Sequence, residues 1–114
     1  MLSKEKKYAI ENGILGHMII DNKVIPRVRE YITDDYEWSQ EYLQDLWYAI
    51  TAISDQAKDN EYFDATDVKV VLDAGPEYGM GFQAGVEHIA RVLEAAPGMD
   101  IDILLKALEI THTK

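Results

Sequence analysis

Apolar residues recur at intervals of three and four along most of this chain, which is the spacing that an amphipathic α-helix produces. The spacing predicts a first helix over about residues 4–20. Asp21 or Asn22 can then cap a second helix, in which Pro26 occupies the first turn and needs no N–H partner. The stripe of the first helix comprises Tyr8, Glu11, Ile14, Leu15, Met18 and Ile19.

An acidic connector, TDDYEW, separates the second helix from the longest one. Ser39 is a plausible cap for this long helix, because serine side chains accept hydrogen bonds from the first free N–H groups of a helix. Its apolar face is formed by Leu43, Leu46, Trp47, Ile50 and Ile53.

The expected helices in the second half of the chain are shorter and are separated by glycine and proline residues. Asp64 or Thr66 can cap the segment DVKVVLDA, a short helix whose β-branched residues also permit a strand. After Gly75, Pro76 and Gly79, a further helix is expected from Phe82, Val86, Ile89 and Leu93. Asp100 can cap the last helix, whose stripe comprises Ile101, Leu104, Leu105 and Leu108. We therefore expect one all-α domain over residues 1–114, a compact bundle of about six helices.

Gly16 lies in the middle of the first expected helix. A glycine there costs roughly 1 kcal/mol relative to alanine, so a close contact with another helix should compensate for it. The sequence suggests that this partner is the face formed by Leu46, Trp47 and Ile50.

The charge pattern changes the expected partners. The 114-residue chain has a net charge of −10, and residues 30–67 contain eleven acids and one base, Lys58. Such a surface repels phosphate backbones, so direct nucleic-acid binding is not expected and a basic protein partner is more natural. The acidity also has a simpler explanation, which is solubility. Because the chain has no cysteine and no apolar run long enough to cross a bilayer, we expect a cytoplasmic protein without membrane contact.

The order of several short motifs resembles the N-terminal domain of replicative DNA helicases of the DnaB family. Leu15 and Gly16 match its "(V/I)LG", and Asp21 and Asn22 match the following turn. In the family an aromatic residue follows an acidic pair. Here the pair is Asp34 and Asp35, and Trp38 takes the place of the aromatic residue, although Tyr36 and Glu37 are inserted between them. Leu46, Trp47 and Ile50 belong to a block similar to "IFxAI". DATDVKVVLDA and Gly81-Phe82 resemble later segments, so the similarity covers nearly the whole chain.

The resemblance implies an assembly role. In such helicases these domains pair, form a collar and provide a docking surface for primase or a loader, while a separate domain is the motor. Residues 1–97 would be the globular part, and residues 98–114 the start of a hairpin. Through Ile101, Leu104, Leu105 and Leu108, that segment either closes the bundle or associates with another copy. The chain has no Gly-Lys pair and hence no P-loop, so we expect neither enzymatic activity nor a cofactor.

Three alternatives remain open at this point. A free-standing domain of this kind, encoded by a phage or mobile element, could modulate a host replicative helicase. The chain could instead be an acidic mimic of DNA, an interpretation that rests on its net charge alone. A magnesium site of Asp34, Asp35, Glu37, Glu41 and Asp45 would need facing carboxylates on a second helix, and Asp64 and Asp67 flank a loop instead. The three histidines show no metal-binding spacing, so no metal is expected.

Overall fold

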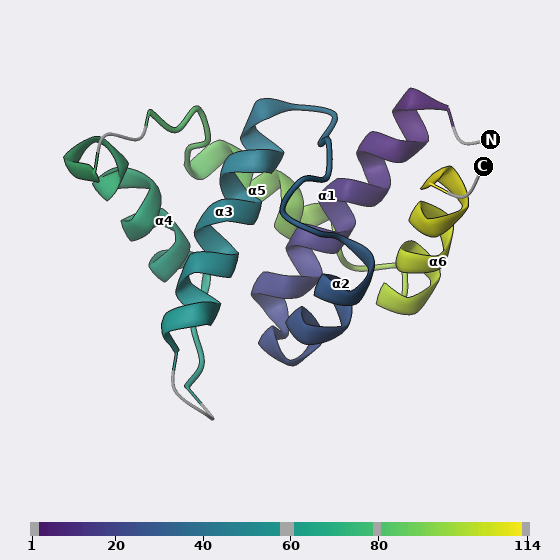
Figure 1. Cartoon of the computed structure of the whole chain (residues 1–114), viewed down its shortest axis with the longest axis horizontal. Coiled ribbons are helices and arrows are strands. Elements are labelled where there is room, and N and C mark those ends of the chain that lie inside the picture. Colours follow the sequence, from purple (N-terminus) through teal and green to yellow (C-terminus); the bar gives the residue numbers. More distant parts are fainter. Residues whose placement is uncertain (1–2, 58–60, 79–80, 113–114) are drawn as a thin grey trace.

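The computed structural model describes residues 3–57, 61–78 and 81–112, and its regular structure is helical throughout these ranges (Figure 1). The expected all-α bundle of about six helices is therefore confirmed. The segment DVKVVLDA is helical rather than extended. The α-helices are α1 (Lys4–Ile20), α2 (Ile25–Tyr31), α3 (Glu41–Gln56), α4 (Ala65–Ala74), α5 (Val86–Ala95) and α6 (Ile101–His112), with short 3₁₀ turns η1 (Asn22–Val24) and η2 (Gly75–Tyr78).

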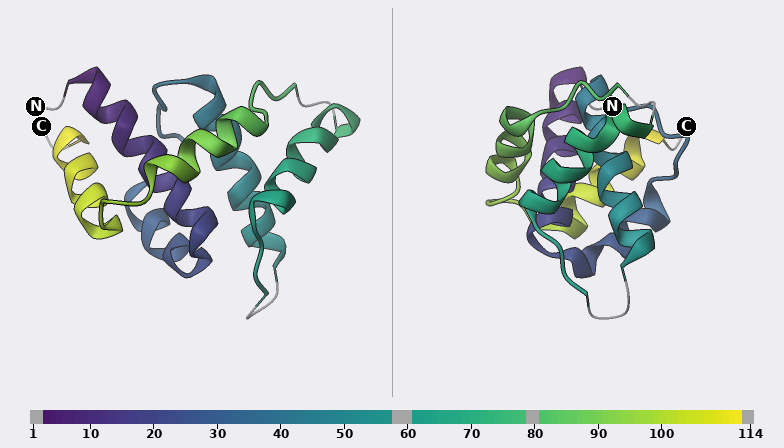
Figure 2. Two further views of the ribbon diagram at one scale, coloured as in Figure 1. Left: turned by 180° about the vertical axis from the view of Figure 1, so that it is seen from behind. Right: turned by 90° about the vertical axis from the view of Figure 1, so that its left-hand side faces the viewer.

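Helix α1 is the centre of the bundle. It packs most extensively against α5 and also contacts α6 and α3, while α4 packs mainly on α3. In Figure 1 the connector between α2 and α3 crosses in front of α1, and Figure 2 shows α5 on the opposite side of the molecule. Ile14, Leu15 and Met18 are fully buried on α1. Each such side chain contributes roughly 1.5–3 kcal/mol by burial.

Side chains cap α1, α4 and α6, whereas α2, α3 and α5 begin without a side-chain cap. Asp64 caps α4 with a reciprocal capping box to Asp67, and the Asp100 side chain accepts from the N–H of Asp102 at 2.8 Å. Ser39 is not the cap of α3, because the N-cap position is Gln40 and no side chain accepts a capping hydrogen bond there. Phe82 lies before α5, which begins at Val86. Gly79, expected as a helix breaker, lies outside the described residues.

The expected partner of Gly16 is wrong. A Cβ atom at Gly16 would lie 2.0 Å from the Val92 carbonyl oxygen and 2.9 Å from the Ala96 Cβ, so the close neighbour is α5 rather than α3. The apolar face of α3 is buried against the same core from another direction. Gly16 thus lets the α1 and α5 backbones meet at a distance that any side chain would prevent.

The apolar stripe of α6 closes the bundle. Ile101, Leu104, Leu105 and Leu108 are 8%, 5%, 0% and 1% exposed within the single chain. Helix α6 packs on α1 and α2, and Leu104 lies against Gly13, where an added Cβ would be 3.0 Å from its Cδ1. These four residues therefore present no open face to a second copy in this structure. Residues 98–108 are continuous with the core of residues 1–97.

No helix in the described ranges combines the length and apolar character needed to cross a bilayer.

The Gly16 contact predicts that Gly16→Ala destabilises the protein by about 1–3 kcal/mol, because the new methyl group meets α5 backbone rather than a movable side chain. Gly13→Ala is the matched control on the same helix, since its neighbour is the flexible end of Leu104. Urea unfolding followed by circular dichroism measures both variants. A Gly16→Ala protein as stable as wild type would contradict the α1–α5 contact.

Candidate functional site

The residues that carry the family resemblance occupy two kinds of position. Leu15, Leu46, Trp47 and Ile50 are at most 2% exposed and belong to one core. Trp38 is half-buried, with its ring 4.8 Å from that of Tyr36 and 5.6 Å from that of Trp47. These positions are structural, so their side chains specify packing rather than a reaction.

Asp21 and Asn22 form the turn after α1. The Asp21 side chain accepts from the Lys23 N–H at 3.1 Å, which caps η1 rather than α2. Asn22 donates to the Met18 carbonyl at 2.9 Å and accepts from the Phe63 N–H at 2.8 Å. Asn22 therefore fastens the segment before α4 to the end of α1, a role that the sequence did not reveal.

A buried acid anchors the connector between α2 and α3. Glu11 on α1 is fully buried and accepts from the Tyr36 hydroxyl at 2.7 Å and from the Ser39 N–H at 3.2 Å. Lys7 Nζ lies 3.5 Å from the same carboxylate and donates to the Glu37 carbonyl at 3.1 Å. Burial and the Glu11 carboxylate raise the pKa of Tyr36 well above its usual range, so its hydroxyl stays protonated and able to donate. The acidic connector thus has a fixed shape.

A second polar network joins α1, α3 and α5. The Tyr42 hydroxyl donates to Asn12 at 2.8 Å and shares a 2.6 Å hydrogen bond with Tyr8, to which Arg91 also donates at 3.2 Å. His88 stacks on the Tyr42 ring at 4.3 Å. Burial, followed by the Tyr8 hydrogen bond, raises the pKa of Tyr42 to about 12. The Tyr42 phenol is therefore neutral at physiological pH, and the network joins the three helices.

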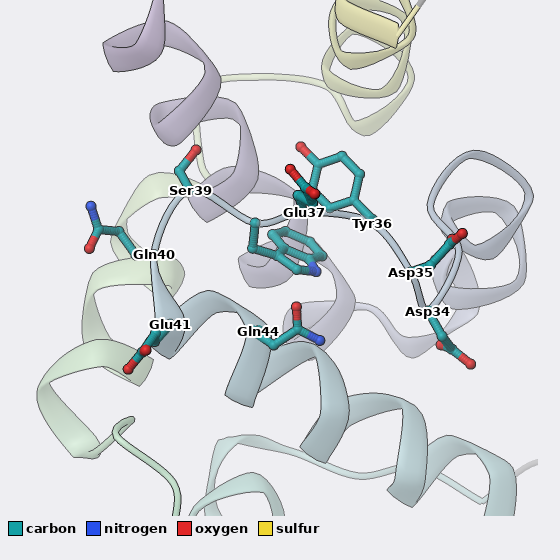
Figure 3. A pocket seen from close by; sticks show the side chains of 9 residues that line it. Asp34, Asp35, Tyr36, Glu37, Ser39, Gln40, Glu41 and Gln44 are labelled. Carbon is teal, nitrogen blue, oxygen red and sulfur yellow. The ribbon is translucent and has the colours of Figure 1, made fainter.

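The surface on the connector side is hollowed. A hollow of about 560 Å³ lies beside the connector, lined by the acids Asp34, Asp35, Glu37 and Glu41 together with polar groups such as Gln44. Figure 3 shows how these side chains are arranged along the connector and the start of α3. Trp38 also lines it, and its indole nitrogen is buried without a hydrogen-bond partner among the described residues. Two further hollows lie along α3: one of about 450 Å³ towards α2, and one of about 380 Å³ towards α4.

The acidic side chains do not converge as metal ligands. Within the described ranges, no three His, Cys, Asp or Glu side chains come together where they could hold a metal ion. Asp45, one of the magnesium candidates, instead accepts from the N–H groups of Gln83 and Ala84 at 2.6 and 3.2 Å. It therefore fixes the segment that leads into α5.

His17 and His88 make polar contacts with the backbone of the fold. His17 Nε2 lies 2.6 Å from the Met99 carbonyl oxygen, and His88 Nδ1 accepts from the Gly85 N–H at 2.9 Å. The side chain of His112 lies outside the described residues. The arrangement as a whole offers open acidic hollows on a rigid helical frame, which suits contact with a macromolecule better than enclosure of a small substrate.

Comparison of the chain with models of known protein families, with curated proteins and with solved structures found no match. The likeness to helicase N-terminal domains stays a prediction that rests on the short motifs.

The anchoring role of Glu11 predicts that Glu11→Ala lowers the free energy of unfolding by about 2–4 kcal/mol, because the Tyr36 hydroxyl and Ser39 N–H lose a charged acceptor inside the protein. Glu5→Ala, an exposed acid on the same helix, is the matched control and should change it by less than about 0.5 kcal/mol. Urea unfolding at pH 7 measures both, and equal effects would contradict this role of Glu11.

Proposed function

We propose that this chain is a non-catalytic protein-interaction and oligomerisation module of a replicative DNA helicase. It would take part in forming the helicase collar and in docking primase or a loader, in the cytoplasm. Its partners would be proteins, including other copies of itself, with no direct contact to nucleic acid or membrane.

The observation that carries this proposal is the contrast between the interior and the surface. The apolar helix faces are buried in one core, and the polar networks make hydrogen bonds between the helices. What the connector side presents outward is a set of open hollows rich in carboxylates. A rigid scaffold with open, charged surfaces is typical of domains that act by docking.

The helicase part of the proposal is supported by the order of the motifs along the sequence. Leu15 and Gly16 lie where α1 packs into the core, and the block Leu46, Trp47 and Ile50 forms the buried face of α3. These motifs lie on successive parts of one helical domain, which is the order that the resemblance requires. The same fold also permits the alternative of a free-standing modulator of a host helicase.

The proposal predicts that the immobilised chain retains at least one of three purified proteins, a replicative helicase, its primase or its loader, at 150 mM salt. An unrelated helical domain of equal net charge is the control for simple electrostatic capture. Retention of none of the three, or equal retention by the control, would contradict the helicase role. If the chain captures a basic protein that the control does not, and duplex DNA competes for that protein, the result would instead support an acidic mimic of DNA.

The oligomerisation part is tested separately, because the α6 stripe is buried and cannot be the interface in this state. Sedimentation equilibrium over increasing protein concentration should show a species of at least twice the monomer mass. A chain that stays monomeric at several hundred micromolar would remove oligomerisation from the proposal and leave docking intact.

A further inference from the structure

Helix α4 lies beside α3 (Figure 1), and the hollow of about 380 Å³ opens between the end of α3 and α4. We call it the α3–α4 hollow. Each helix contributes three lining residues with the spacing i, i+3, i+4: Ile53, Gln56 and Ala57 from α3, and Asp67, Val70 and Val71 from α4. Residues at this spacing share one face of a helix. The hollow is therefore a single space between one face of α3 and one face of α4, with residues 61–63 along its border.

The segment that borders the α3–α4 hollow is fastened to the end of α1. The Tyr62 hydroxyl donates to the Ile20 carbonyl at 3.2 Å, and the Phe63 N–H donates to the Asn22 side chain at 2.8 Å. Phe63 is 5% exposed and belongs to the core. Because this border is held by the rest of the fold, the hollow exists before a partner binds, and binding loses little conformational freedom.

Most side chains that line the α3–α4 hollow are apolar. Ile53 and Val71 are partly buried against the core, whereas Tyr62 and Val70 are 67% and 61% exposed. Single exposed apolar residues are ordinary on protein surfaces, but two that border one hollow with apolar walls are typical of a binding surface. Its volume is at the lower end of the range for ligand sites, roughly 300–1,000 Å³, which suits an anchoring side chain of a partner.

The charges of the α3–α4 hollow select a basic partner. Glu61 and Asp67 line it, and none of its described lining residues is basic. Asp67 accepts from the Asp64 N–H at 2.9 Å within the cap of α4, whereas Glu61 is exposed and pairs with no cation among the described residues. A second copy of the chain, with a net charge of −10, would be repelled, and so would a nucleic acid. Lysine or arginine is the complementary group for Glu61.

We propose that the α3–α4 hollow binds a segment of a partner protein that presents a large aliphatic side chain beside a lysine or arginine. The aliphatic side chain would contact Tyr62 and Val70, and the basic group would face Glu61. This inference rests on the protein-docking part of the proposed function and specifies its surface and the chemistry of its partner.

The probe is the peptide Lys-Leu-Leu-Lys with acetyl and amide ends. Glu-Leu-Leu-Glu reverses its charge and keeps its apolar centre, while Lys-Ser-Ser-Lys keeps its charge and removes that centre. Titration into the ¹⁵N-labelled protein at 150 mM salt should give saturable amide shifts in residues 61–71, with each comparison peptide binding at least about fivefold more weakly. Equal binding of Lys-Leu-Leu-Lys and either comparison peptide overturns the proposal, and so does binding of none of the three.

Variants place the binding in the hollow. Glu61→Lys should weaken binding of Lys-Leu-Leu-Lys about fivefold, and Val70→Ser about threefold. Glu94→Lys and Val86→Ser on α5 are the matched controls, because neither residue lines the hollow and Val86 is 61% exposed, like Val70. Each control should change the affinity less than about twofold. All four positions are exposed, so the variants should fold, which circular dichroism checks. Controls with effects equal to those of Glu61→Lys and Val70→Ser overturn the proposal.

The same experiments separate this inference from the helicase role. If Lys-Leu-Leu-Lys binds as expected but no purified replicative helicase, primase or loader is retained, the hollow stands and the helicase role is wrong. If one of these proteins is retained equally by wild type and Glu61→Lys while the three peptides bind equally, the helicase role stands and the inference about the hollow is wrong.

Discussion

The close approach of α1 and α5 at Gly16 is the constraint on which the rest of the bundle depends. The Val92 carbonyl oxygen occupies the space of a Gly16 side chain, so the two backbones are in direct contact. With α5 held this close on one side, α1 can become the central helix, with α3 and α6 packed on its other sides. The cost of a glycine within a helix, about 1 kcal/mol, is offset by the burial that this packing allows.

Because α1 is central, two of its polar residues, Glu11 and Asn12, are buried, and their hydrogen bonds organise the neighbouring segments. Glu11 faces the connector between α2 and α3, and Asn12 faces Tyr42 at the start of α3. A carboxylate left unpaired at such a depth would be strongly unfavourable, so the Tyr36 hydroxyl and Ser39 N–H that satisfy it also determine the path of the acidic connector. The hollows on that side are therefore features of a fixed backbone.

The sequence predicted what periodicity and capping chemistry encode, namely the bounds of α1, the caps at Asp64 and Asp100, and the all-helical fold. It could not identify partners. A spacing of 3.6 residues shows which face of a helix is buried but not against which helix. The sequence therefore suggests α3 instead of α5 as the partner of Gly16. It also leaves open whether the α6 stripe closes the bundle or associates with another copy. Glu11 was the missed signal: a charged residue within an apolar stripe indicates a buried polar contact. Nothing in the local sequence links Asn22 to Phe63, 41 residues later.

The helical frame, the buried anchors of the connector and the position of the acidic hollows all depend on the contact between α1 and α5 at Gly16. Amide chemical shifts of the ¹⁵N-labelled protein, compared between wild type and Gly16→Ala, test this contact most directly. The largest shifts should fall in α1 and α5 around Gly16 and Val92, with α4 nearly unchanged. Shifts no larger in α5 than in α4 would contradict it.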